Sequence, residues 1–105
     1  MAERYRRAKS SARNEILAAE GRERREGKDS IPARIARLNA YKKEATFLET
    51  RCQRILTMLS KAKKLGNKKR VKALEAEYMR SERAFNETGF KREIMAEELK
   101  EDLAK

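Results

Sequence analysis

The residues of this sequence with the clearest chemistry are cations gathered around Gly66 and Asn67. No acidic residue occurs between Glu49 and Glu75. Seven cations stand within five positions of the Gly-Asn pair: Lys61, Lys63, Lys64, Lys68, Lys69, Arg70 and Lys72. Ammonium and guanidinium groups bind phosphate oxygens, and a chain of net charge +11 attracts polyanions. These seven residues are therefore the predicted nucleic-acid-binding residues at the centre of the chain.

Four of these cations, Lys68, Lys69, Arg70 and Lys72, lie where they would weaken a helix. If the chain turns at Gly66, a new helix opens with these residues, and its N-terminal end carries a partial positive charge that disfavours cations. The free N–H groups at a helix N-terminus bind phosphate, so an external anion would explain cations at this position. The alternative is that they serve only to keep the chain soluble.

A second basic segment opens the chain. The predicted phosphate contacts in it are Arg4, Arg6 and Arg7, and only Glu3 among the first seven residues is acidic. These arginines could follow a phosphate backbone or enter an acidic groove of a protein. Tyr5 lies between them and is the aromatic residue best placed to stack on a base.

The residue types on which most enzymes and metal sites depend are absent or isolated. The sequence has no His, and its single cysteine, Cys52, cannot build a zinc site alone. The glycines are scattered singly, so the chain has no glycine-rich phosphate loop. Carboxylate pairs such as Glu97 and Glu98 would find no cavity to desolvate them in a narrow helical protein. We therefore expect no enzymatic activity, no catalytic residue, no metal and no cofactor.

The element that would position the central cations is a long heptad pattern. Asp29 or Ser30 can cap a helix that carries Pro32 in its first turn, and no Gly or Pro follows until Gly66. Apolar or small residues then recur at spacings of three and four: Ile31, Leu38, Ala45, Cys52 and Leu59, interleaved with Tyr41, Leu48, Ile55 and Ala62. Such spacing is typical of a coiled-coil seam.

The same pattern resumes after Gly66 as a mirror image of itself. Its positions are Val71, Leu74, Tyr78, Ser81, Phe85, Thr88, Arg92, Met95 and Leu99. Reflection pairs residues whose numbers add up to 133, such as Leu59 with Leu74 and Leu48 with Phe85, and small residues face large ones in several layers. The predicted fold is therefore all-α, with a long antiparallel helical hairpin built as a two-stranded coiled coil.

The predicted organisation has two parts. Residues 1–28 form a basic N-terminal arm that is partly helical, with a helix expected over residues 12–26 and a hinge at Gly27. Residues 29–105 form the hairpin, with its turn at residues 66–67.

Two details of the hairpin follow from this register. Arg37 would lie near Glu98, a favourable pairing across the two arms. The second arm is weakest at Thr88 and Gly89, where a break would leave residues 90–104 as a separate, re-phased C-terminal helix.

A second apolar stripe remains once the seam is assigned. It consists of Phe47, Met58 and Leu65 on the first arm and Phe90 and Ile94 on the second. We expect these protein-interface residues to be covered, either by the N-terminal arm through Ile16 and Leu17 or by a second copy of the chain. The chain is accordingly expected to be a homo-oligomer or part of a larger complex.

The expected location follows from what the sequence lacks. No apolar run approaches the length of a membrane span, and the N-terminus has no signal-peptide stretch. Cys52, the single cysteine, cannot form an internal disulfide; it agrees with a reducing compartment and, at a seam position, is expected to be buried. We expect a protein of the cytoplasm or of a virion, neither secreted nor bound to a membrane.

Two functions of different class fit these features. The first is a non-enzymatic architectural or packaging protein that binds DNA or RNA through phosphates and largely tolerates any sequence. The second is an adaptor, scaffold or structural component of a larger assembly, including a viral particle, which would use the apolar stripe and would place its basic residues on an acidic protein surface.

Overall fold

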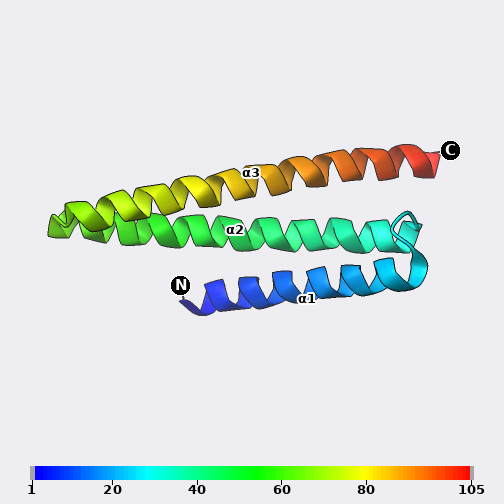
Figure 1. Ribbon diagram of the computed structural model, residues 1–105, viewed down its shortest axis with the longest axis horizontal. Coiled ribbons are helices and arrows are strands. Elements are labelled where there is room, and N and C mark those ends of the chain that lie inside the picture. Colours follow the sequence, from blue (N-terminus) through cyan, green and yellow to red (C-terminus); the bar gives the residue numbers. More distant parts are fainter. Residues whose placement is uncertain (1, 105) are drawn as a thin grey trace.

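The computed structural model describes residues 2–104, which form three long helices (Figure 1): α1 (Ala2–Glu26), α2 (Ile31–Leu65) and α3 (Lys68–Ala104). No strand occurs among these residues, so the prediction of an all-α chain is confirmed. None of the three helices contains a stretch long and apolar enough to cross a membrane.

The helices lie side by side with α2 in the middle (Figure 1). α1 packs along one side of α2 and α3 along another, while the backbones of α1 and α3 do not approach each other. The result is an elongated particle of 58 × 24 × 17 Å with one short connection at each end of α2. α2 is therefore the only helix that contacts both of the others.

The connection between α2 and α3 is closed by backbone and side-chain caps. Gly66 adopts the left-handed conformation (φ 70°), which glycine tolerates because it has no Cβ. The N–H of Gly66 donates to the carbonyl of Lys63 at 3.1 Å, and the N–H of Asn67 donates to the carbonyl of Ala62 at 3.2 Å. The Asn67 Oδ1 then accepts the N–H of Arg70 at 3.2 Å, so one residue ends one helix and caps the next.

The connection between α1 and α2 spans residues 27–30. Gly27 is left-handed (φ 87°), and its N–H donates to the carbonyl of Glu23 at 3.0 Å. Ser30 is the N-cap of α2, because its hydroxyl accepts the N–H of Ala33 at 3.3 Å. Pro32 stands in the first turn, where a missing N–H costs nothing.

The buried residues of α2 and α3 stand mostly at the seam positions of the sequence pattern. The apolar cluster nearest the turn consists of Ile55, Leu59, Ala62 and Leu74, with Met58, Val71 and Tyr78 packed against it. Farther from the turn the buried positions include Ala45, Leu48, Ser81, Thr88 and Leu99. Because small and polar residues dominate this second group, most large apolar burial lies in the half of the molecule next to Gly66.

The contact between α1 and α2 is made by small residues. Ala12 and Ala19 of α1 and Ala33 and Ala40 of α2 are at most 3% exposed. Alanine side chains let two helix backbones approach closely, so α1 docks with little apolar area. This helix is also longer than the predicted 12–26, since residues 2–11 gain support from lying on α2.

An ion pair joins the same two helices. The Nε of Arg37 lies 2.7 Å from the Oε1 of Glu23, and both side chains are largely shielded from solvent. The expected pairing of Arg37 with Glu98 is therefore wrong, because α1 occupies the side of α2 toward which Arg37 points. The hydrogen bond from Arg37 lowers the pKa of Glu23 below its ordinary value of 4.5.

α3 runs without a break through Thr88 and Gly89, so a separate, re-phased C-terminal helix is not found. One glycine costs a helix only about 1 kcal/mol, which is small for a helix of 37 residues held by packing. Thr88 and Leu99 are buried, and Arg34 of α2 forms an ion pair with Asp102. These contacts keep the C-terminal part of α3 in line with the rest.

Candidate nucleic-acid interface

The seven central cations come together at the end of the molecule where α2 meets α3. We call Lys61, Lys63, Lys64, Lys68, Lys69, Arg70 and Lys72 the basic tip; all seven are exposed. The last turn of α2 supplies Lys63 and Lys64, and the first turn of α3 contains no acidic residue. None of the ion pairs among residues 2–104 involves a member of the tip. Their charges are therefore not neutralised by the described part of the chain.

The backbone at the start of α3 adds donors to these charges. Asn67 accepts the N–H of Arg70 through its side chain and the N–H of Val71 through its carbonyl, at 3.2 and 3.0 Å. Within residues 2–104 this leaves the N–H groups of Lys68 and Lys69 open to an external acceptor. The capping role of Asn67 was not predicted, although an Asn directly before a helix is a usual capping signal.

A shallow hollow of about 420 Å³ lies at the tip. It is lined by Lys63, Gly66, Lys68, Val71 and Lys72. Three lysines thus line it together with Val71, and its surface is largely apolar. Long cationic side chains can reach from such a rim to a phosphate, and no carboxylate stands at the rim to compete with it.

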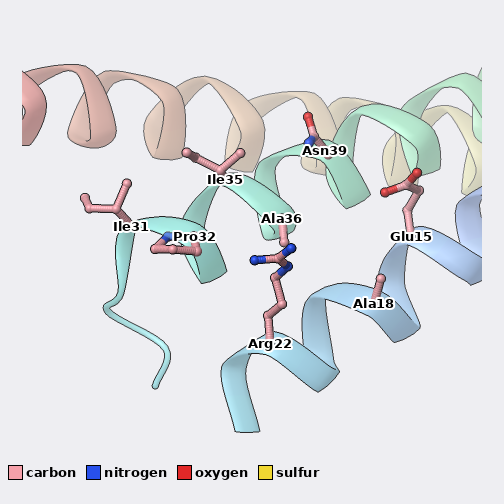
Figure 2. A pocket seen from close by; sticks show the side chains of 8 residues that line it. All are labelled: Glu15, Ala18, Arg22, Ile31, Pro32, Ile35, Ala36 and Asn39. Atoms are coloured by element: carbon pink, nitrogen blue, oxygen red, sulfur yellow. The ribbon is translucent and has the colours of Figure 1, made fainter. Parts of the chain in front are cut away.

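A larger hollow, of about 480 Å³, lies at the other end of α2, where α1 turns into it (Figure 2). Its lining residues are Glu15, Ala18 and Arg22 of α1 and Ile31, Pro32, Ile35, Ala36 and Asn39 of α2. Figure 2 shows Arg22 extending from α1 toward Ala36 and Pro32. The Arg22 guanidinium is 3.8 Å from Glu26, and Glu15 adds a second carboxylate nearby. This hollow is therefore larger than that of the tip but nearly balanced in charge.

The predicted N-terminal contacts lie on the same half of the molecule as the tip (Figure 1). Arg4, Arg6 and Arg7 are exposed, and Arg7 pairs with Glu3 at 2.7 Å. Arg54 stands over Tyr5, with its guanidinium carbon 4.7 Å from the ring centroid. Arg54 precedes Gly66 by twelve residues, or about 18 Å of helix. Arg54 thus adds a cation of α2 beside the N-terminal arginines, a contact that sequence spacing did not predict.

Tyr5 is not free to stack on a base. Its ring lies 5.5 Å from the ring of Phe47 and is covered on another side by Arg54, which leaves it only half-exposed. The expectation of a base-stacking platform is corrected accordingly: Tyr5 fixes the N-terminal end of α1 to α2. Tyr41 and Tyr78 are half-buried too, and Tyr78 packs against the apolar cluster of the seam.

The predicted interface residues do not form one covered face. Phe47 is half-buried and shares a hollow of about 230 Å³ with Ile16 and Leu17. Leu17 itself is exposed, and α1 ends before it reaches the tip, so Leu65 remains 84% exposed. The expected cover by α1 is thus wrong for Leu65, because α1 is too short to span α2.

The remaining members of the apolar stripe predicted from the sequence differ in exposure. Met58 is half-buried against the seam cluster, whereas Phe90 and Ile94 lie exposed on α3.

Cys52 is half-buried rather than fully enclosed, and desolvation, together with the negative charge of Glu82, raises the pKa of its thiol. Its thiol is therefore less ready to ionise than an ordinary cysteine.

Four acidic residues of α3 lie at the end of the molecule opposite the tip. Glu93, Glu97, Glu98 and Glu101 are all exposed on the last turns of α3. Arg24, Arg25 and Lys28 are exposed at that end as well, so it is mixed in charge, whereas no acidic residue lies between Glu49 and Glu75 around the tip. The candidate surface is defined by the cations of the tip and by the geometry of the turn. No protein-family model, curated protein or solved structure matches the chain.

Proposed function

We propose that this protein is a non-enzymatic nucleic-acid-binding protein that contacts phosphates through the basic tip and through Arg4, Arg6 and Arg7. The observation that carries the proposal is the exposure of seven cations at one end, without an ion pair to any of them among residues 2–104. Four of them occupy the start of α3 against the helix dipole, a cost that a bound phosphate would reverse.

The proposal assigns α2 and α3 the role of a stiff two-stranded coiled coil that carries the tip. Buried seam residues support this role near the turn, and two ion pairs support it along the length. The Arg51 guanidinium lies 3.6 Å from Glu77, and Arg34 pairs with Asp102 near the other end. Exposed pairs contribute only about 0–1 kcal/mol each, so they adjust the alignment of the helices rather than hold them together.

Binding of this kind does not read base sequence. The two helices are too long, and their connection too tight, to place a recognition helix in a major groove as a helix-turn-helix does. Tyr5 is occupied by Phe47 and Arg54, which removes the best candidate for base stacking. The affinity is therefore expected to depend steeply on salt and weakly on sequence. An architectural or packaging role fits these properties.

The test is a salt titration of binding. A fluorescently labelled duplex and a labelled single strand are titrated with protein, and anisotropy gives the affinity at each salt concentration. Each phosphate contact contributes about 0.9 to the log–log slope on duplex and about 0.7 on single strands. Changing Lys68, Lys69 and Arg70 together to Gln should lower the slope on duplex by roughly two to three.

A matched control separates the tip from net charge. Arg24, Arg25 and Lys28 are exposed at the opposite end of α2, so their joint change to Gln removes the same charge away from the tip. This variant should keep most of the slope. Equal losses in both variants, or an unchanged slope in the tip variant, would contradict the proposed site.

The second candidate function is an adaptor or structural component that binds an acidic protein surface. The exposure of Leu65 within the basic tip favours it, because an apolar residue ringed by cations suits a mixed protein interface. The ratio of absorbance at 260 to 280 nm after purification in low salt distinguishes the two. If the purified protein is free of nucleic acid and binds none, the adaptor role is the function that remains.

A further inference from the structure

The side of α3 that faces away from α2 carries a second heptad stripe. Its members are Lys72, Ala76, Met79, Arg83, Asn86, Phe90 and Glu97. Successive members are four or three residues apart, except that Glu97 follows Phe90 by seven. All seven are exposed, whereas the residues of α3 that meet α2 are buried or half-buried at nearly every seam position. α3 lies at the edge of the molecule (Figure 1), and α1 does not reach it. The described chain therefore leaves this stripe uncovered.

Large apolar residues stand on either side of Arg83 and Asn86, the central pair of the stripe. Met79 is 68% exposed and Phe90 is 64% exposed, and Ile94 lies one turn beyond Phe90 with 43% of its surface open. Residues eleven and four positions apart project from the same side of a helix. Isolated exposed apolar residues are common on proteins, but three aligned on one side of an unpartnered helix form a contact surface.

The charges at the two ends of the stripe are opposite. Lys72 stands near its start and Glu97 near its end, and neither takes part in the ion pairs found among residues 2–104. Lys68 and Glu101 extend the same polarity at either end. A parallel copy of α3 would place like charges together, whereas an antiparallel copy would place each cation beside a carboxylate.

We propose that this stripe of α3 is the interface with a second copy of the chain, paired antiparallel about a two-fold axis close to Ala84 and Phe85. In that pairing Met79 lies opposite Phe90 of the second copy, and Lys72 lies opposite Glu97. Lys72 and Met79 share one core position of the heptad, and Phe90 and Glu97 share the other. An antiparallel coiled coil pairs these two core positions across its interface. The contact is the same on both copies, so it closes at a dimer.

This dimer has a consequence for the tips. The C-terminal end of α3 in each copy lies beside the basic tip of the other, so Lys68 and Lys72 face carboxylates in the dimer. Phosphate contacts by the dimer then fall to the five other tip cations, which stay exposed: Lys61, Lys63, Lys64, Lys69 and Arg70. The interface does not depend on nucleic-acid binding, and it is measured on protein from which nucleic acid has been removed.

The first test is the mass of the full chain in solution. Sedimentation equilibrium at low salt, over a wide range of protein concentrations, should show the 12.3 kDa chain giving way to a species of twice that mass. Phe90→Asp should abolish the larger species. Leu65→Asp introduces the same charge at an exposed apolar residue outside the stripe and should leave the dimer intact. A chain that stays monomeric throughout, or that loses the dimer equally in both variants, overturns the proposal and leaves the stripe to a different protein.

The second test reports the antiparallel polarity. Lys72→Glu and Glu97→Lys should each weaken the dimer, because each sets like charges against each other. The double variant Lys72→Glu/Glu97→Lys restores opposite charges across the interface and should recover the affinity. Both positions are exposed, so circular dichroism should show unchanged helix content in all three. Failure of the double variant to recover the dimer would overturn the antiparallel pairing.

Discussion

Ser81 is the position at which a change of one atom should make this protein more stable. Its side chain is 2% exposed between α2 and α3, and its hydroxyl has no hydrogen-bond partner within residues 2–104. A buried polar group without a partner costs about 1–3 kcal/mol in lost hydration. Ser81→Ala removes that cost and keeps the volume of the side chain nearly the same.

The magnitude combines three contributions. Removing the unpaired hydroxyl should stabilise by about 1–3 kcal/mol, and the better helix propensity of Ala should add about 0.5 kcal/mol. The space left by one oxygen should subtract about 0.5 kcal/mol, since residual cavities cost roughly 24 cal/mol per Å³. The net expectation is a gain of about 1–3 kcal/mol, or roughly 4–14 °C in Tm for a domain of this size.

Urea denaturation followed by circular dichroism measures this gain, with the slope of the transition expected to stay unchanged. Ser60→Ala is the matched control, because Ser60 is exposed on α2 and its change alters helix propensity alone. Its gain should be about 0.5 kcal/mol. If Ser81→Ala gains no more than Ser60→Ala, then the hydroxyl has a stabilising partner and the reasoning fails.

Further changes test other contacts. Because the hydrogen bond from Arg37 lowers the pKa of Glu23, their pairing should stabilise the fold above pH 4.5 and be lost as the pH falls through the lowered value. Glu23→Gln should therefore cost about 1–2 kcal/mol near neutral pH and little in strong acid, as compared by urea denaturation at both. Gly66→Ala should destabilise by about 1–2 kcal/mol because of its positive φ, whereas Gly89→Ala should stabilise by about 1 kcal/mol because nothing within 4 Å would meet the added Cβ. A gain for Gly66→Ala in thermal denaturation would contradict the left-handed cap. Leu59→Ala should cost about 2–4 kcal/mol as a truncation within the buried cluster, and a loss below 1 kcal/mol would mean that the helices separate easily near the turn.

Much of the seam between α2 and α3 could be predicted because its residues repeat at the helical period. Ile55, Leu59 and Leu74 stand out as large apolar residues in a highly charged chain, and all three are buried. The turn between α2 and α3 could also be predicted, since Gly66 and Asn67 interrupt an otherwise continuous heptad pattern of apolar residues. The spacing of large apolar residues predicts the contacts that those residues make, and Ile55, Leu59 and Leu74 are residues of this kind.

The docking of α1 could not be read in the same way. Its fully buried residues are alanines, Ala12 and Ala19, and a lone alanine in a charged helix gives no clear sign of burial. The partner of Arg37 depends on which helix lies beside it, so it could not be known before α1 was placed. The same holds for Tyr5, whose contacts with Phe47 and Arg54 join positions far apart in the sequence.

In the candidate site, too, contacts between neighbours in the sequence could be predicted and contacts between distant residues could not. The cations of the tip were predictable because a turn at Gly66 collects neighbours in sequence into neighbours in space. The contribution of Asn67 as a cap and of Arg54 as a link to the N-terminal arginines required the backbone geometry and the position of α1.

The absence of backbone contact between α1 and α3 means that the protein can open in steps. α1 is held to α2 by alanines, by one ion pair and by the contacts of Tyr5 with Phe47 and Arg54, so its detachment exposes few large apolar side chains and leaves the pairing of α2 with α3 unchanged. Amide protons of α1 should accordingly exchange with solvent before those of the turn region. If the protein binds nucleic acid as proposed, the arginines near the N-terminus of the opened form would act as a tether that captures a distant phosphate chain and draws it toward the tip.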